Sequence, residues 1–453
     1  MRPHPALLRA VGAAALSAAA FAQIPPGYYG AVDTTNGTTL RATLHGLIDD
    51  HLKIPYTASA TDTWDVLESA DQNPANSTQI LDLYKNQAFA KQGGGNTFYN
   101  REHVWPNSYG FPNDGADNYP YSDCHHLFLC DIQYNSDRGN RPFRACASGC
   151  TEATTVATNG TGGGSGSYPG NSNWTSASPT LGSWETWRDR RGDVARALFY
   201  MDVRYAGGVH GGTGQPEPDL VLTDNTTLIG NSSTGSNLSV AYMGLLTTLV
   251  AWHRQDPPDD KERERNDVVF SFQGNRNPFI DHPEWVDCVF AGACLPGIPT
   301  CAGDGSLATA CPCGNTGGAG RGCANSVNAT GALLTASGAQ LPADTLVLLA
   351  SGMPSVASTS AIFLQGDARS ASGQVFGDGV LCAGGALIRL GSKATPGGSA
   401  QYPGVGNQSV SVRGLVTPGS GAMRFYQTYY RNAAAAFCPP ATFNVTNGFQ
   451  VVW

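Results

Sequence analysis

The chain has 453 residues, of which 14% are charged, and its formal net charge is −8. This length suggests two or three domains, and the low charge with abundant glycine favours an extracellular protein rich in turns and strands over a cytosolic helical enzyme. The acidity excludes a protein that grips nucleic acid through a broad basic surface, so that any phosphate site must be a local cleft or be screened by divalent cations.

The first 22 residues are predicted to be a secretory signal peptide. Arg2 and Arg9 precede a run of small apolar residues that ends in Ala20-Phe21-Ala22, an A-x-A cleavage pattern. This run is too short to span a bilayer, and no later segment reaches that length. We therefore expect a secreted protein, extracellular or periplasmic, that does not bind membranes. Loss of both arginines makes its charge −8 − 2 = −10.

Apolar residues at helical spacing predict helices over 38–52, 186–205 and 239–253. The first would be capped by Thr38 or Thr39. In the second, arginines occupy the positions away from the apolar face, and the third is apolar around most of its circumference, so it is expected to be buried.

Two further segments of the first part are predicted to lie at the surface. The alternating charges of 259–267 indicate a solvated helical face. The stretch 151–178 is rich in Gly, Ser, Thr and Asn, which predicts a surface loop whose removal would cost little stability.

After residue 294 the chain is dense in Gly, Pro and Cys, and short apolar runs alternate with turn residues. This texture predicts a disulfide-linked all-β domain of sandwich-like form. The expected domains are 23–294, a linker over 295–325, and the β domain over 326–453, whose function and partner stay unknown. The strand candidates are 346–350, 361–365, 387–390, 409–416, 423–430 and 449–453.

Twelve cysteines divide into six before residue 295 and six after residue 300. In an exported chain, even numbers on each side argue for disulfides closed within each domain. Cys146 with Cys150 and Cys288 with Cys294 are close enough in sequence to close small loops. A zinc site around Cys311 is an alternative, but the oxidising environment outside the cell favours disulfides.

Residues suited to catalysis gather in three segments: NREHVWP from Asn100, DCHHL from Asp123 and NSDRGN from Asn135. Histidine suits a general base because its pKa lies near neutrality. Carboxylate and amide oxygens are ligands that Mg²⁺ prefers. We predict that His103 activates water for phosphodiester hydrolysis, and that Glu102 and Asn135 bind Mg²⁺, with Mn²⁺ or Ca²⁺ as alternatives.

Glu102 and His103 are adjacent in sequence, which restricts the backbone conformations that would let both side chains reach one site. Neighbouring residues of a regular strand point to opposite faces. The two side chains can share a site only if the strand twists, bulges or ends near them, and Pro106 makes such an irregularity plausible.

These segments, together with RRGDVARALFYMDVRY and GNRNPF, resemble the bacterial periplasmic and extracellular nucleases of the endonuclease I family over about residues 30–290. The resemblance implies an α+β nuclease domain with a ββα-metal, or His-Me, finger. By position it makes Glu102 a metal ligand, His103 the general base and Asn135 a second ligand presented by the finger helix. It also implies cleavage of DNA, and possibly RNA, to leave 5′-phosphates.

The resemblance extends to neighbouring positions with less definite roles. Asp137, Arg138 and Asn140 match residues around the finger helix, and Arg138 and Asn140 are expected to bind phosphate or support the site. His126 stands where the family has an amide, so its role stays open. The arginine that contacts the scissile phosphate is left among four candidates, Arg138, Arg141, Arg144 and Arg276.

Two other functions remain open from sequence. One is a secreted binding or adhesion protein built on an inactive nuclease scaffold, which the acidity and His126 favour. The other is a metallohydrolase of small phosphoesters. Intact Glu102, His103 and Asn135 oppose the inactive scaffold, and turnover of small diesters but not of polymers would mark the metallohydrolase. We expect an endonuclease, and we expect it to be a monomer.

Overall fold

The computed structural model describes residues 24–453 except 116–117, 165, 178–181, 356–359 and 435. The expected signal peptide lies outside the described residues. None of the helices in the described part of the chain is long and apolar enough to cross a membrane.

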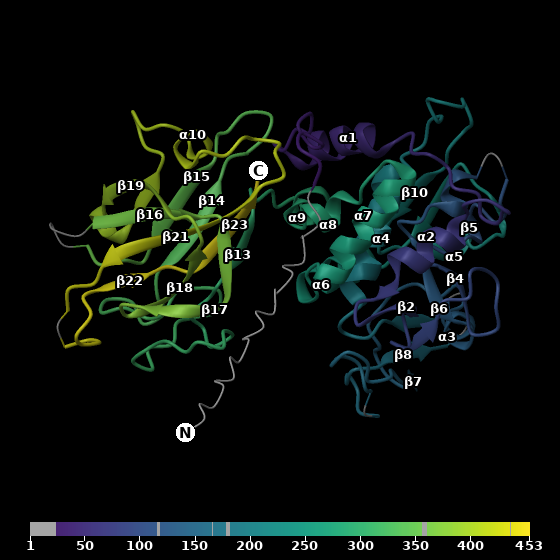
Figure 1. The fold of residues 1–453 in the computed structure, drawn as a ribbon, viewed down its shortest axis with the longest axis horizontal. Helices are drawn as coiled ribbons and strands as arrows, with labels where there is room; N and C mark the ends of the chain where they lie inside the picture. The colour runs from purple at the N-terminus through teal and green to yellow at the C-terminus, as the bar shows by residue number, and fades with distance from the viewer. Residues whose placement is uncertain (1–23, 116–117, 165, 178–181, 356–359, 435) are drawn as a thin grey trace, which may run out of the picture.

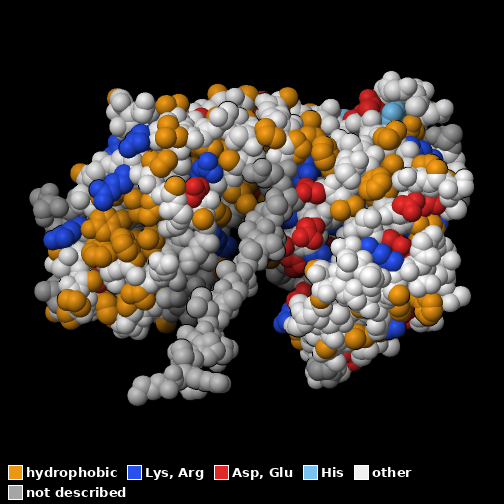
Figure 2. Space-filling view, viewed as in Figure 1, with side chains coloured by type: hydrophobic (Ala, Val, Ile, Leu, Met, Phe, Trp, Pro, Cys, Tyr) orange, Lys and Arg blue, Asp and Glu red, His pale blue; other side chains and the backbone are white. Residues whose placement is uncertain are grey.

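The chain forms a mixed half (residues 24–297) and a strand-rich half (residues 298–453), which lie side by side in Figure 1. Each half has its own large hydrophobic core. On the face shown in Figure 2, acidic side chains gather on the mixed half near the junction, whereas apolar side chains form a broad patch on the strand-rich half.

The mixed half is built around one central helix, α4, of which nearly every residue is buried. Helices α1, α6 and α8 pack against it. The helices are α1 (Gly37–Ile48), α2 (Thr63–Ala70), α3 (Ile132–Arg138), α4 (Arg191–Arg204), α5 (Thr226–Ser232), α6 (Leu246–Gln255), α7 (Asp260–Gln273), α8 (Pro278–Asp281) and α9 (Glu284–Ala291), with the 3₁₀ turn η1 (Tyr119–Ser122).

Short strands surround these helices in separate small sheets: β1–β2–β3, β4–β6, β7–β8–β9, and the parallel pairs β10–β12 and β5–β11. Their bounds are β1 (Gln72–Asn73), β2 (Asn76–Leu81), β3 (Ala88–Ala90), β4 (Tyr99–His103), β5 (Tyr109–Gly110), β6 (Leu127–Asp131), β7 (Thr151–Ala153), β8 (Asn173–Ser176), β9 (Ser183–Glu185), β10 (Asp219–Leu222), β11 (Ser236–Asn237) and β12 (Val240–Met243).

The structure corrects the first two predicted helices. Helix α1 starts earlier than expected because Asn36 is the cap, its side chain accepting a hydrogen bond from the backbone N–H of Thr39, and it ends at Ile48. Helix α4 exists, but Arg196 and Arg204 are fully buried and paired with carboxylates. The expectation that the arginines lie away from the core was wrong because the helix is enclosed on all sides.

The prediction of a third helix over 239–253 was wrong for its first residues. Residues 240–243 form β12, which pairs in parallel with β10, and only then does α6 begin. Backbone pairing with a distant strand overrides the local helical periodicity of this segment.

The predicted removable loop 151–178 contains strands β7 and β8, which β9 completes as a sheet. Asn173 in β8 is buried and its Nδ2 donates to the backbone oxygen of Tyr84, 2.7 Å away. The expectation that this stretch is only a surface loop was therefore wrong, whereas the low cost of its removal stays a prediction. The charged run on α7 is likewise only partly solvated, since Glu262 and Arg265 are buried.

The strand-rich half has a six-stranded sheet in the order β13–β23–β21–β16–β19, with β22 beside β21, and a three-stranded sheet β14–β15–β20. Both sheets contribute side chains to one core. The elements are β13 (Ile298–Thr300), β14 (Leu333–Ser337), β15 (Val347–Ser351), β16 (Ser360–Gly366), β17 (Ala368–Phe376), β18 (Gly379–Gly384), β19 (Ile388–Ala394), η2 (Pro396–Gly398), β20 (Ala400–Tyr402), α10 (Val410–Gly414), β21 (Met423–Arg431), β22 (Phe443–Val445) and β23 (Gly448–Val452).

Most strands of this half agree with the sequence prediction, but the one expected over 409–416 was wrong. Ser409 caps a short helix, α10, by accepting a hydrogen bond from the backbone N–H of Val412. The helix ends at Leu415, which has a left-handed φ of 52°. The apolar residues of this segment suit either a strand or a helix, and the capping serine favours the helix.

Five disulfides join ten cysteines, each within one half. The pairs are Cys146–Cys150, Cys288–Cys294, Cys301–Cys382, Cys311–Cys323 and Cys313–Cys438. Both small loops predicted from sequence are confirmed. The expectation that all six cysteines of the first half pair was wrong, since Cys124 and Cys130 are buried thiols that face different apolar clusters.

The two halves are in direct contact through the first described residues. The backbone N–H of Gly27 donates to the oxygen of Gly419, and the hydroxyl of Thr34 donates to the oxygen of Leu341, 2.9 Å away. The side chain of Leu341 belongs to the core of the mixed half.

Candidate active site

The predicted site residues lie on two antiparallel strands and the helix that follows them. In the β4–β6 pair, Tyr99 is opposite Asp131 and His103 is opposite Leu127. Helix α3 starts directly after β6, and Asp131 caps it by accepting from the backbone N–H groups of Gln133 and Tyr134. The resulting strand–strand–helix unit brings 99–103 next to 132–138.

Glu102 is buried on the side of β4 that faces α3. Its Oε1 accepts a hydrogen bond from the hydroxyl of Tyr84 at 2.8 Å and pairs with Nη1 of Arg138 at 3.1 Å. Burial raises the pKa of this carboxyl to about 7, although Arg138 and Tyr84 oppose the rise. Both contacts fall on Oε1, so within the described chain Oε2 has no hydrogen-bond donor.

Asn135 comes to the same side of β4 from α3. Its Nδ2 donates to Oδ1 of Asn100 at 2.7 Å and to the backbone oxygen of Arg101 at 3.5 Å. These bonds fix which end of the amide faces the strand. The amide oxygen Oδ1 has no hydrogen-bond partner among the residues that the structure describes.

Arg138 is fully buried and its contacts are all with the protein. Besides Glu102, its guanidinium donates to the backbone oxygens of His103 at 3.0 Å and Val104 at 2.6 Å. It also lies 4.5 Å from the ring centre of Phe143. These contacts join the end of β4 to α3 and engage the guanidinium with protein groups.

His103 is held by one backbone carbonyl. Its Nε2 lies 2.9 Å from the oxygen of Tyr121. A carbonyl only accepts hydrogen bonds, so Nε2 carries the proton and Nδ1 keeps a lone pair. Burial lowers the pKa of the ring to about 3, with nearby His126 adding to the effect, and the imidazole is therefore neutral at physiological pH.

The contacts of β4 divide between its two faces, as strand geometry requires. Asn100 and Glu102 contact α3, whereas Arg101 and His103 contact Tyr56 and Tyr121. Among the described residues, the ring of His103 hydrogen-bonds to neither Glu102 nor Asn135. Strand β4 ends at His103.

His126 directly precedes β6, and Asn140 follows α3. The ring of His126 is fully buried, its Nε2 lies 2.7 Å from the oxygen of Pro120, and it packs 5.5 Å from the ring of His103. Burial lowers the pKa of His126 to about 4. The uncharged ring of His126 therefore packs against the ring of His103. The backbone oxygen of Asn140 accepts a hydrogen bond from the hydroxyl of Tyr109.

The remaining arginine candidates differ in how firmly they are held. Arg276 is buried against Asp267 and Asp281, and Arg141 donates to the backbone oxygens of Asp137 and Ala177. Within the described residues, the half-buried side chain of Arg144 has no ion pair or hydrogen bond. Of the four sequence candidates, Arg144 is thus the one with a guanidinium uncommitted to the protein.

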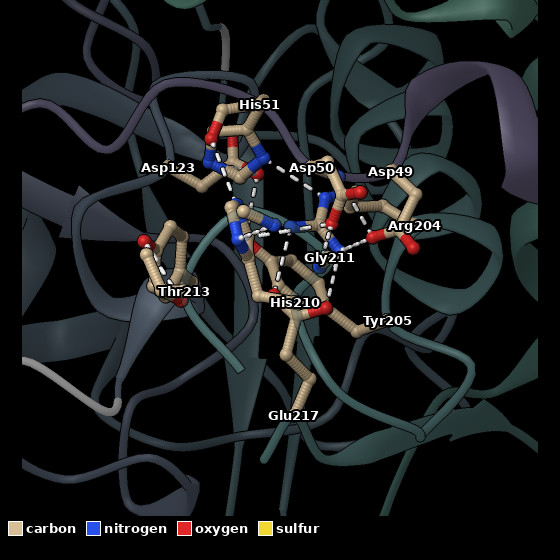
Figure 3. Close-up of polar contacts among 12 residues, drawn as sticks. Asp49, Asp50, His51, Asp123, Arg204, Tyr205, His210, Gly211, Thr213 and Glu217 are labelled. Carbon is tan, nitrogen blue, oxygen red and sulfur yellow. Dashed lines mark hydrogen bonds and ion pairs between the residues drawn. The ribbon is translucent and has the colours of Figure 1, made fainter. Parts of the chain in front are cut away.

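A buried polar network fixes the segment before β6. The Oδ2 atom of Asp123 accepts from the hydroxyls of Tyr200 and Tyr205 at 2.9 Å, and lies 3.8 Å from Nε2 of His51. His51 in turn accepts from Arg204, which also forms paired hydrogen bonds with Glu217 (Figure 3). The Asp-Cys-His-His segment is therefore anchored to α4, which explains why so many polar residues there are buried.

Several contacts of the site could not be found from sequence. Tyr84 and Tyr56 are distant in the chain from the NREHVWP segment, and neither belongs to a recognisable motif. Asn100 and Tyr121 adjoin the predicted segments, but their bonds to Asn135 and His103 depend on tertiary packing.

No group of three or more His, Cys, Asp or Glu side chains that could hold a metal ion occurs within the described part of the chain. The pair Glu102 and Asn135 contains only one such side chain. A cation at this pair would therefore take its other ligands from water and from the substrate, as Mg²⁺ commonly does.

Comparison with known proteins assigns the mixed half of the chain to a family. The family model for endonuclease I matches residues 36–284. Extracellular ribonucleases of Bacillus amyloliquefaciens and Bacillus subtilis (strain 168) are each 39% identical over 263 residues, which cover 57% of this chain and 76% and 77% of theirs. The residues that the family model matches contain the whole β4–β6–α3 unit. The chain is thus a nuclease, a hydrolase acting on nucleic acid, and belongs to the endonuclease I family.

Proposed function

We propose that this protein is a secreted endonuclease that hydrolyses phosphodiester bonds of DNA and RNA with one divalent cation, of which Mg²⁺ is the first candidate. The observation that carries the proposal is the tautomer of His103. Its Nε2 proton is committed to Tyr121, which leaves the Nδ1 lone pair available at the end of β4. The relatives are extracellular and the chain holds five disulfides, which supports secretion.

The residues present fit a hard cation. Glu102 Oε2 and Asn135 Oδ1 are both oxygens without a hydrogen-bond donor in the described chain, and both belong to the side of β4 that faces α3. A divalent cation bound there would neutralise charge on the phosphate and stabilise the departing oxygen. Arg138 keeps Glu102 oriented through Oε1 and leaves Oε2 available.

His103 would act as the general base. Its Nδ1 takes a proton from a water molecule as the water oxygen forms a bond to phosphorus, and the bond from phosphorus to O3′ breaks. The departing O3′ takes a proton from solvent water, and the products are a 3′-hydroxyl and a 5′-phosphate. Tyr121 holds the ring through Nε2 during this transfer, so that Nδ1 stays directed at the reacting water.

Water as nucleophile makes the 2′-hydroxyl of ribose unnecessary, so this chemistry applies equally to DNA and RNA. The curated relatives are named ribonucleases. We therefore include RNA as a full substrate beside the DNA that the sequence motifs favoured.

The test is His103→Ala, assayed on supercoiled plasmid and on RNA with and without chelator. We expect both cleavage rates to fall by roughly 10²- to 10⁴-fold, the usual contribution of a general base. A suitable control is His45→Ala, because the ring of His45, although only half-buried, is likewise bonded to one backbone carbonyl. Full activity in folded His103→Ala would reject the assigned base, and an inactive wild-type protein would support a binding role instead.

A further inference from the structure

Two tyrosine rings stand beside the ring of His103. Tyr56, from the loop after α1, lies nearly parallel to it with centroids 5.8 Å apart and an interplanar angle of 26°. Tyr121, from η1, lies 4.7 Å from it, and the two tyrosines contact each other edge to face at 4.7 Å. Both tyrosines are half-buried, and the ring of each contacts the ring of the proposed general base.

The ring of Tyr56 packs against the side chain of Arg101. The guanidinium of Arg101 lies 3.4 Å from the ring centre of Tyr56 and 4.3 Å from that of Trp64. Arg101 also donates to the backbone oxygen of Tyr56 and to the hydroxyl of Thr63. This packing fixes the loop that carries Tyr56, so the ring is a rigid surface rather than a mobile side chain.

The positive charges near the site are mostly engaged with the protein. Arg138 pairs with Glu102, Lys85 pairs with Asp131, and Arg101 is bound to Tyr56 and Thr63. The whole chain carries a net charge of −8. Binding that depends on neutralising many phosphates of a duplex is therefore poorly supported here, and another source of affinity is needed.

We propose that Tyr56 and Tyr121 stack a nucleobase next to the scissile phosphate and thereby select unpaired strands of nucleic acid, an inference that rests on the proposed function of His103. In a duplex both faces of each base are covered by neighbouring bases. An unpaired base offers a free face, and stacking on aromatic side chains is tolerant of sequence. Single-stranded RNA and DNA, and unpaired loops, are then the preferred substrates.

The test compares kcat/KM on a labelled single strand and on the same strand in a duplex. Each tyrosine is replaced by phenylalanine, which keeps the ring, and by leucine, which keeps bulk without an aromatic face. We expect Tyr56→Leu and Tyr121→Leu to lower kcat/KM on the single strand by roughly tenfold or more. The phenylalanine variants should lose less activity than the leucine variants. Because both rings also pack on His103, the leucine variants should slow the duplex as well, but by less than they slow the single strand.

A matched control is Tyr429→Leu, a half-buried tyrosine in β21 of the strand-rich half. The inference is overturned if wild type cleaves the duplex as fast as the single strand, if leucine and phenylalanine act alike, or if leucine slows both substrates equally.

Binding to a fluorescent 12-mer in the His103→Ala background separates this inference from the proposed function. Weaker binding after Tyr56→Leu, without any cleavage by the wild type, would retain the stacking surface and reject the nuclease chemistry. If cleavage needs His103 but does not change in either leucine variant, the nuclease chemistry is retained and the stacking surface is rejected.

Discussion

The two halves of the molecule are held together by different interactions. In the mixed half, arginines on α4 are buried against carboxylates of other elements, and its two disulfides close loops with sequence separations of only 4 and 6. In the strand-rich half, Cys301–Cys382 and Cys313–Cys438 join residues separated by 81 and 125 positions. Buried charge pairs thus join separate elements of the mixed half, whereas covalent cross-links join distant parts of the strand-rich half.

The largest effect is expected from the longest disulfide loop. Replacing Cys313 and Cys438 by serine should destabilise the strand-rich half by about 5 kcal/mol, against about 2 kcal/mol for Cys146 and Cys150, because a longer loop restricts the unfolded chain more. Urea unfolding followed by limited proteolysis of each half measures this. Equal losses of unfolding free energy after removal of either disulfide would contradict the proposed role of the long cross-links.

The buried ion pairs of the mixed half should come next. Arg196 is fully buried against Glu262, and Arg196→Met would leave that carboxylate uncompensated, at a cost of roughly 3–5 kcal/mol. Arg254→Met is the control, since the Arg254–Asp287 pair is largely exposed and should contribute less than about 1 kcal/mol. Urea midpoints that move equally in both variants would contradict this contrast.

The contact between the halves is tested at Leu341. This residue belongs to the strand-rich half but is buried in the core of the mixed half. Leu341→Ala should cost about 3 kcal/mol through lost apolar burial and a new cavity. Thermal unfolding provides the measurement, with the exposed Leu387→Ala as control. No shift for Leu341→Ala would mean that the halves are only loosely associated.

The smallest predicted effect concerns acid stability. Burial lowers the pKa of His253 to about 3, with Arg196 adding to the effect. Because the unfolded state binds the proton more readily, stability is lost as pH falls below about 6.5, by roughly 1.4 kcal/mol at pH 5.5.

His253→Gln should remove this loss while keeping a donor for the oxygen of Pro283. Comparing urea midpoints of wild type and variant at pH 7.5 and 5.5 cancels the contributions of other groups. Parallel pH dependence in the two proteins would show that His253 does not titrate on unfolding.

Much of the architecture could be predicted from local sequence. The periodicity of 38–52 and the alternation of 423–430 gave elements close to those observed, because their own apolar faces are what they bury. Segment 240–243 could not be predicted, because its strand exists only through pairing with β10. The buried arginines of α4 were also missed, since charge pairing with α7 depends on tertiary structure.

The site shows the same limit. The sequence motifs predicted Glu102, His103 and Asn135 as site residues. In the structure all three lie on one strand–strand–helix unit. Their orientation depends on Tyr84, Asn100 and Tyr121, whose contacts leave no periodic trace in the sequence.

Calorimetric titration of Mg²⁺ or Mn²⁺ into wild type, His103→Ala and Glu102→Gln tests most directly whether metal binding and proton transfer belong to different residues. We predict that His103→Ala binds the cation as wild type does while losing nuclease activity, and that Glu102→Gln loses the binding. Unchanged cation affinity in folded Glu102→Gln, or loss of binding in His103→Ala, would contradict the account.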